Sequence, residues 1–147
     1  MGTRLEEVRF DEDLRLTYPL LGHTDRRRVI YDPEAILKDL PGNWIHHNVL
    51  LISEDNLQLG LHYHDYNELY FTPTGGFDVR FVDNEDLATR RYNLHPGSRL
   101  LIPQEVSHMV TADKGSVLLV YGTVPFDPKR LITPKDNKVL EALASMG

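Results

Sequence analysis

Residues 61–73 read Leu-His-Tyr-His-Asp-Tyr-Asn-Glu-Leu-Tyr-Phe-Thr-Pro, and this stretch decides the fold. Successive side chains of a strand point to opposite faces, so His62 and His64 are expected on the same face. Glu68 follows across a short turn and can return to that face on the next strand. His108 is a fourth donor further along the chain. Three neutral imidazoles and one carboxylate suit one divalent transition metal, such as Fe, Mn, Ni, Co or Zn.

The first three donors follow a recognisable pattern, His62-x-His64-x3-Glu68-x6-Gly75. It resembles the first signature motif of the cupin superfamily in spacing and in residue type. The leading Gly of that motif has no counterpart here, because position 56 is Asn and Gly60 stands only two residues before His62.

The fourth donor ends a second pattern, Gly97-x5-Pro103-x-Glu105-x2-His108. It resembles the second cupin motif, with Glu105 in place of a Gly and Ala112 in place of an Asn. These departures fall at turn positions, while the position of the metal ligand is kept.

The resemblance to cupins covers residues 45–126. It implies an all-β fold, the cupin-type double-stranded β-helix or jelly-roll barrel. It also implies a metal bound by His62, His64, Glu68 and His108. Because one fold can carry many unrelated reactions, the resemblance specifies the fold and the metal site more closely than the chemistry.

The composition sets further limits on the chain. Its 147 residues suit one domain, and 41% apolar and 26% charged residues are ordinary for a globular protein. A net charge of −6 argues against a nucleic-acid partner. We expect no membrane span and no secretory signal. Because there is no cysteine, disulfides and thiolate ligands are excluded, and we expect a cytoplasmic protein.

Short strands separated by Gly and Pro dominate from residue 49 onward, as in a sandwich or barrel. We expect a short helix over 33–40, and a closing helix that begins at Thr133 and buries Val139, Leu140 and Leu143. The chain then divides into an N-terminal arm with a helix (1–44), a cupin barrel (45–126) and a C-terminal segment with a helix (127–147). The predicted strands are 28–31, 49–53, 57–63, 68–72, 77–82, 90–94, 99–102, 107–111 and 117–123.

Open sheet edges in a barrel of this kind favour pairing with a second chain. Because two-fold homo-oligomers are the commonest assemblies, we expect a homodimer.

Four protein ligands leave one or two coordination positions open, as a catalytic metal requires. Tyr70 lies two residues after Glu68, so it shares that face, whereas Tyr63 points away. Tyr121, on the last long strand, is a second phenol that could move protons. His46 and His47 point in opposite directions if a strand has begun there, so one of them can line a pocket.

Two subfamily resemblances compete. The run from Leu61 to Tyr70, with Tyr121 four residues before Pro125, is similar to cupin-type dimethylsulfoniopropionate lyases. That resemblance implies a metal-bound substrate carboxylate and a catalytic Tyr at position 70 or 121. The run 60–64 and the later Pro-Phe-Asp-Pro (125–128) are similar to small cupins of sugar-nucleotide pathways, which act as isomerases, epimerases or binding modules.

Both resemblances share one mechanistic core. A metal polarises an oxygen of a small organic acid or sugar-derived substrate, and a nearby Tyr or His moves a proton from the adjacent carbon. We therefore expect a metal-dependent lyase or isomerase. An Fe(II) dioxygenase and a non-catalytic metal-dependent module for small molecules or sugars are the alternatives. Under the sugar-nucleotide interpretation, the run Arg26-Arg27-Arg28 would bind a diphosphate.

Overall fold

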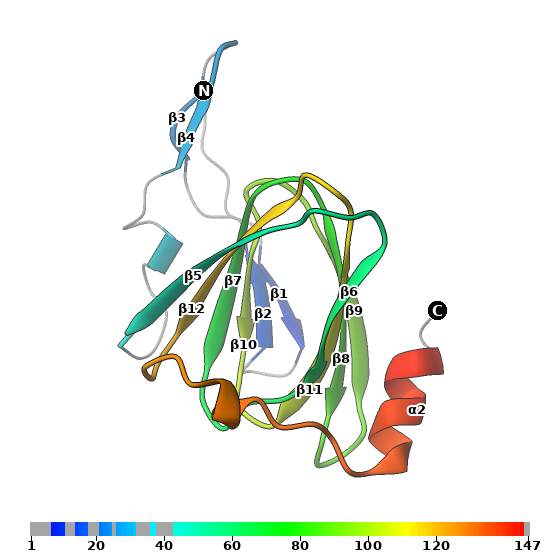
Figure 1. The fold of residues 1–147 in the computed structure, drawn as a ribbon. Helices are drawn as coiled ribbons and strands as arrows, with labels where there is room; N and C mark the ends of the chain where they lie inside the picture. Colours follow the sequence, from blue (N-terminus) through cyan, green and yellow to red (C-terminus); the bar gives the residue numbers. More distant parts are fainter. Residues whose placement is uncertain are drawn as a thin grey trace.

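The computed structural model describes residues 7–10, 14–17, 21–24, 26–31, 36–37 and 43–145. Two antiparallel sheets face each other in a jelly-roll arrangement, and a C-terminal helix lies outside one of them (Figure 1). This architecture confirms the predicted all-β cupin fold. Among the described residues, no helix is long and apolar enough to cross a membrane.

The larger sheet has six strands in the order β1-β2-β10-β7-β12-β5. β10 and β7 form its centre, and β7 pairs with both β10 and β12. The strands are β1 Glu7–Phe10, β2 Leu14–Thr17, β5 His46–Leu51, β7 Glu68–Thr74, β10 Arg99–Ile102 and β12 Val117–Gly122.

The smaller sheet has four strands in the order β6-β11-β8-β9, so that β11 lies between β6 and β8. The strands are β6 Leu57–His62, β8 Phe77–Asp83, β9 Thr89–Leu94 and β11 Val106–Ala112. A separate hairpin, β3 Leu21–Thr24 with β4 Val29–Tyr31, projects away from the barrel (Figure 1).

The main core lies between the two sheets. β8 shows why the sequence forms this structure: Phe77, Val79 and Phe81 alternate with outward-facing residues and are at most 2% exposed. Each such burial contributes about 1.5–3 kcal/mol relative to an exposed side chain.

Two smaller clusters cover the outer faces of the sheets. Helix α2, Asn137–Ser145, packs Val139 and Leu143 against Val82 and Met109 of the four-stranded sheet. A second cluster packs Ile36 and Trp44 on the outer face of the six-stranded sheet, with a group on β7, β10 and β12: Leu69, Phe71, Leu101, Leu119 and Tyr121.

The strand predictions agree with the structure from β4 onward, with shifts at the strand ends. β1, β2 and β3 were missed, because short four-residue strands carry little periodic signal. Since β1 and β2 join the six-stranded sheet, residues before 45 contribute to the barrel sheet, and the division of the chain into three segments stays a prediction.

The two predicted helices have different outcomes. The closing helix begins at Asn137 rather than Thr133, because Asp136 acts as the cap: its Oδ1 accepts a hydrogen bond from the N–H of Lys138 at 2.9 Å. Of the helix expected over 33–40, residues 36 and 37 are helical, and the remainder lies outside the described residues.

The expected homodimer also stays a prediction.

Candidate metal centre

The structure brings together the four predicted metal donors. The ring nitrogens of His62, His64 and His108 lie within 4.8 Å of one another. The Oε1 atom of Glu68 lies 3.2 Å from Nε2 of His64 and 3.8 Å from Nε2 of His108. The donors come from the end of β6, the following turn, the start of β7 and the middle of β11.

A bulge in β6 turns His62 toward this cluster. His108 pairs with His62, but the next residue of β11, Met109, pairs with Gly60, so Leu61 is an extra residue. Gly60 and Leu61 both have positive φ, +84° and +65°. Without the extra residue, strict alternation would place His62 on the face opposite Leu59.

The packing of the neighbouring leucines confirms this change of face. Leu57 and Leu59 pack against the core between the sheets, whereas Leu61 packs beside α2 on the outside. His62 instead contacts the rings of His64 and His108, each at 4.7 Å between centroids. The bulge therefore places Leu59 and His62, three positions apart, on the same face.

Several atoms in the cluster are buried without a hydrogen-bond partner among the described residues: Nδ1 and Nε2 of His64, Nε2 of His108 and Oε1 of Glu68. Glu68 is also within ion-pair distance of both histidines. Each unsatisfied polar atom costs about 1–3 kcal/mol. Imidazole nitrogens and a carboxylate oxygen that converge in this way are suitable ligands for a divalent cation.

The tautomer of His108 also fits a metal ligand. Its Nδ1 lies 3.1 Å from the carbonyl of Val106, and because a carbonyl can only accept, Nδ1 carries the proton. Its Nε2 then presents a lone pair to the cluster. A backbone carbonyl commonly fixes the tautomer of a metal-binding histidine in this way.

The electrostatics favour neutral imidazoles at His62 and His108 beside a negative carboxylate at Glu68. Burial lowers the pKa of His62 to about 4 and that of His108 to about 3. Burial acts to raise the pKa of Glu68, but the adjacent His64 and His108 outweigh it and hold that pKa below its usual range. At neutral pH the group of His62, Glu68 and His108 therefore carries a net negative charge, which favours a cation.

Tyr70 lies on the same face of β7 as Glu68, as its position two residues further along the strand predicted. Its side chain belongs to the core between the sheets, and its ring lies 6.0 Å from that of His108. Burial and the nearby Glu68 carboxylate raise the pKa of Tyr70 well above its usual value. The phenol is therefore protonated at neutral pH.

Tyr121 does not reach the cluster, and this placement does not support the predicted catalytic role. On β12, Leu118 and Val120 point into the core between the sheets, so Tyr121 points outward with Leu119. Its ring contacts that of His47 at 4.8 Å. The sequence placed Tyr121 on this strand, but it did not show which face of the strand points inward.

Tyr66 was not singled out from the sequence. It is 5% exposed, and its ring lies 4.6 Å from that of His64 and 5.9 Å from that of His46. Burial, followed by the Glu68 carboxylate, raises the pKa of Tyr66 to about 12. Its place in the turn between two motif ligands was the only available signal, and strand alternation does not apply there.

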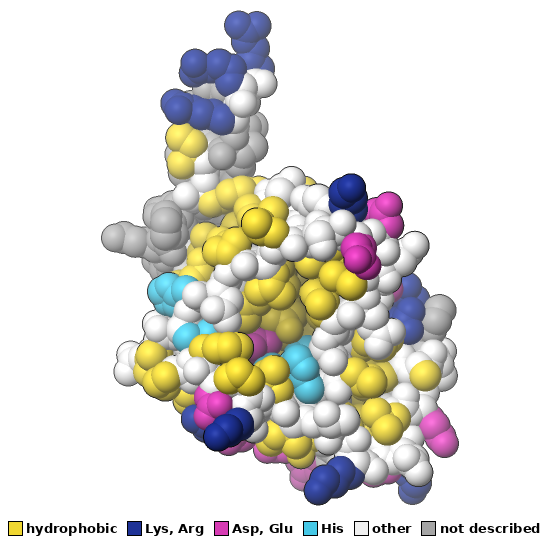
Figure 2. All heavy atoms as spheres, in the orientation of Figure 1, with side chains coloured by type: hydrophobic (Ala, Val, Ile, Leu, Met, Phe, Trp, Pro, Cys, Tyr) yellow, Lys and Arg dark blue, Asp and Glu magenta, His cyan; other side chains and the backbone are white. Residues whose placement is uncertain are grey.

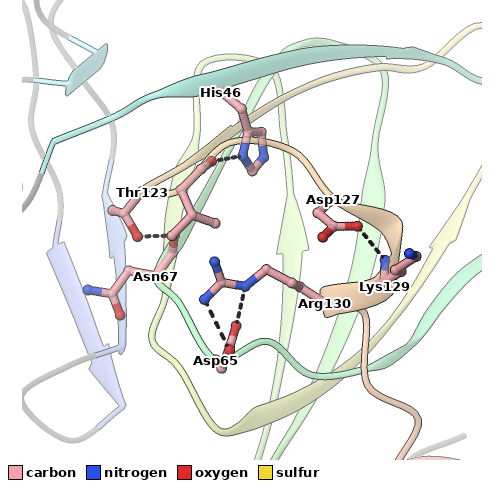
Figure 3. Close-up of polar contacts among 8 residues, drawn as sticks. His46, Asp65, Asn67, Thr123, Asp127, Lys129 and Arg130 are labelled. Atoms are coloured by element: carbon pink, nitrogen blue, oxygen red, sulfur yellow. Dashed lines mark hydrogen bonds and ion pairs between the residues drawn. The ribbon is translucent and has the colours of Figure 1, made fainter.

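His46, not His47, faces inward. It is 8% exposed, and its Nδ1 donates a hydrogen bond to the carbonyl of Val124 at 2.6 Å (Figure 3). Gly122 provides the space, because a Cβ there would overlap the imidazole. Nε2 is therefore the basic nitrogen of His46.

The backbone keeps the cupin turn at Glu105, where the motif has Gly. Glu105 has a φ of +65°, the left-handed conformation that glycine adopts freely. Its N–H donates to the carbonyl of His64 at 2.9 Å and so supports the turn that carries His64.

The molecule is hollowed between the sheets at the end that carries the donors (Figure 2). Hydrophobic side chains line most of the hollow, and acidic and histidine side chains lie at its lower end. Arg26, Arg27 and Arg28 join β3 to β4 on the projecting hairpin, away from this opening (Figure 1).

No protein-family profile matches the sequence, and no curated protein matches it significantly. Solved structures match the fold. A sugar 3,4-ketoisomerase from Thermoanaerobacterium thermosaccharolyticum, in complex with TDP, is 18% identical, covers 94% of this chain and 100% of its own, and gives a TM-score of 0.73.

A mutant of that ketoisomerase, in complex with TDP-4-keto-6-deoxyglucose, covers 90% of this chain and 96% of its own at 18% identity and a TM-score of 0.73. A dTDP-4-dehydrorhamnose 3,5-epimerase from Bacillus anthracis, with TDP and pyrophosphate bound, is 17% identical. It covers 92% of this chain and 88% of its own, and gives a TM-score of 0.75. At these identities the likeness establishes the fold.

Proposed function

We propose that this chain is a metal-dependent cupin enzyme that moves a proton on a small sugar-derived or organic-acid substrate. The observation that carries the proposal is the convergence of His62, His64, Glu68 and His108 with buried atoms that lack hydrogen-bond partners among the described residues. These four residues would hold one divalent transition metal. Such a metal acts as a Lewis acid on a carbonyl or carboxylate oxygen of the substrate.

The solved structures support an isomerase rather than a lyase. Those of similar fold are named as ketoisomerases and epimerases of TDP-linked sugars. A keto sugar isomerises by loss of a proton from the carbon beside its carbonyl, followed by return of a proton elsewhere. The resemblance of residues 61–70 to lyases supports the same first step, with departure of a leaving group as the second.

Two residues of this chain suit the two proton transfers. His46 carries its proton on Nδ1, so Nε2 can accept a proton from the substrate. Tyr70 is held as a phenol beside Glu68 and can donate one. Neither residue belongs to the four donors, so binding and proton transfer are separable by mutation.

The first test measures metal content. Protein purified without chelator is analysed for metals as wild type, H62A, H108A and H95A. We expect near-stoichiometric metal in wild type and in H95A, whose side chain is exposed on a distant turn. Loss of a ligand should lower the affinity by more than about 100-fold, since even outer-shell changes cost about 10–100-fold. Equal metal in H108A and wild type would overturn the proposed centre.

The second test measures the reaction. Metal-loaded protein is incubated in D2O with TDP-4-keto-6-deoxyglucose, the ligand of a structural neighbour, and deuterium incorporation is followed by NMR under air and under argon. Incorporation in both atmospheres supports the isomerase or lyase. Strict dependence on iron and O2 would indicate the dioxygenase. Metal and sugar binding without any exchange, unchanged in Y70F, would indicate a binding module.

A further inference from the structure

Asp65 and Arg130 form an ion pair at the rim of the candidate metal centre, and Figure 3 shows this pair. Arg130 donates two nearly parallel hydrogen bonds to Asp65, from Nε to Oδ1 at 3.0 Å and from Nη2 to Oδ2 at 3.1 Å. Asp65 directly follows the candidate ligand His64. The two side chains are 37% and 46% exposed, so solutes can reach both.

The guanidinium of Arg130 lies one aromatic ring away from the candidate ligands. It sits over the ring of Tyr66, 5.6 Å from the centroid, and that ring in turn lies 4.6 Å from the ring of His64. The Tyr66 ring therefore separates the guanidinium of Arg130 from the ring of His64, so a substrate several ångströms long could contact both Arg130 and the centre.

The backbone holds Arg130 in place without help from Asp65. Arg130 ends the short 3-10 helix η1, Pro128–Arg130, which Asp127 caps by accepting a hydrogen bond from the N–H of Lys129 at 3.0 Å (Figure 3). Just beyond it, Ile132 exchanges two backbone hydrogen bonds with Tyr63, at 2.9 and 3.0 Å. Loss of the ion pair would leave this support intact.

An exposed ion pair contributes little to stability, so the fold does not depend on this one. A guanidinium, however, is a two-pronged donor that matches the oxygens of a carboxylate or a phosphate. Asp65 presents to Arg130 the geometry that an anionic ligand would present.

We propose that Arg130 binds the oxyanion of the substrate, a carboxylate or a phosphate, and that Asp65 occupies this place in the free protein and is displaced. This inference rests on the proposed function for the location of the reacting end of the substrate. It assigns the anion to Arg130 rather than to the Arg26–Arg28 run, which lies on the projecting hairpin.

A second ion pair of the same geometry provides a matched control. Arg91 donates to Asp78 from Nε at 2.8 Å and from Nη2 at 2.7 Å, across β8 and β9. Asp78 and Arg91 lie on the outer face of the four-stranded sheet, because their neighbours Phe77, Val79 and Tyr92 point into the core. D78N and R91Q change the net charge as D65N and R130Q do, but not at the rim.

The test is calorimetric titration of metal-free, chelator-treated protein with two probes, inorganic pyrophosphate and malonate. In R130Q we expect the affinity for the better probe to fall by about 10-fold or more, the loss typical of charge-assisted hydrogen bonds. In D65N we expect the affinity to rise by about 2- to 5-fold, because the carboxylate that competes for Arg130 is removed and exposed ion pairs are weak. R130K should weaken binding less than R130Q. The probe that binds more tightly identifies the oxyanion.

D78N and R91Q should bind both probes as wild type does. Unchanged affinity in R130Q, weaker binding in D65N, or an equal rise in D65N and D78N would each overturn the assignment. Melting temperatures of all variants verify folding. The result is separable from that of the metal centre, because R130Q should retain metal, whereas H108A should lose metal but still bind the anion probe.

Discussion

The inner and outer faces of the six-stranded sheet carry tyrosines with different surroundings. Tyr70 pairs in register with Val120, and Tyr121 pairs with Leu69, so the two phenols stand one step apart on adjacent strands. Tyr70 lies in the core beside His108, whereas Tyr121 packs on the outside against His47. A single step along a strand therefore separates a residue that can take part in chemistry from one that packs the fold.

The largest difference between the faces is expected in proton transfer. Y70F removes the hydroxyl beside the candidate centre and should slow deuterium exchange into the keto sugar by about 10²- to 10⁴-fold, the usual contribution of a general acid or base. Y121F should stay within about twofold of wild type, because its hydroxyl is on the outer face. Equal losses in both variants would contradict the assignment of the faces.

The second difference concerns how the stability of the metal-free protein depends on pH. His62 and His108 have folded-state pKa values of about 4 and about 3 because of burial, below the unfolded value of 6.5. In this range the unfolded chain binds more protons than the folded one. Stability is therefore fully present above pH 6.5 and is lost as pH falls toward 4. The lowered pKa of Glu68 acts in the same direction at more acidic pH.

This pH dependence is measured as the melting temperature of chelated protein between about pH 7.5 and pH 4.5. H108Q should show a shallower decline than wild type, because a buried titrating group is removed. H47Q, on the outer face, should decline as wild type does. A wild-type curve that is flat, or one that H108Q reproduces, would show that these imidazoles do not titrate as their burial indicates.

A smaller effect is expected where His46 packs on the sheet. G122A places a methyl group in the space that the imidazole fills, and it should lower the free energy of unfolding by about 1–3 kcal/mol. Gly76 is the matched control, since a Cβ there would meet only the carbonyl of Leu94 at 3.7 Å. Urea denaturation measures both variants. If G122A is as stable as G76A, His46 does not occupy this position in solution.

The smallest effect is expected at the turn that supports His64. E105G relieves a left-handed residue and should raise the free energy of unfolding by about 0.5–1 kcal/mol. Asn56, with a φ of +55°, is the comparison. Because Asn tolerates this conformation, N56G should gain less than E105G, and a larger gain in N56G would argue against strain at Glu105.

The succession of strands along the chain and the set of candidate metal ligands were largely readable from local sequence. Each strand from β4 onward has its own alternation or turn signal, and the four donors sit at the motif spacing. The C-terminal helix was found but placed too early, because a Thr-Pro pair and a later Asp are both valid starting signals, and only contacts decide between them. β1 and β2 depend on pairing with β10, which is a long-range contact.

The sequence by itself determined which residues share a face within a strand, because side chains alternate with a period of two. It also singled out the four candidate metal ligands, which the structure brings together. Only the tertiary structure decided which face lies inside, since that depends on the partner sheet. It placed Tyr121 outside and His46 inside, used the Gly60–Leu61 bulge to turn His62 inward, and joined Asp65 to Arg130 from a distant part of the chain.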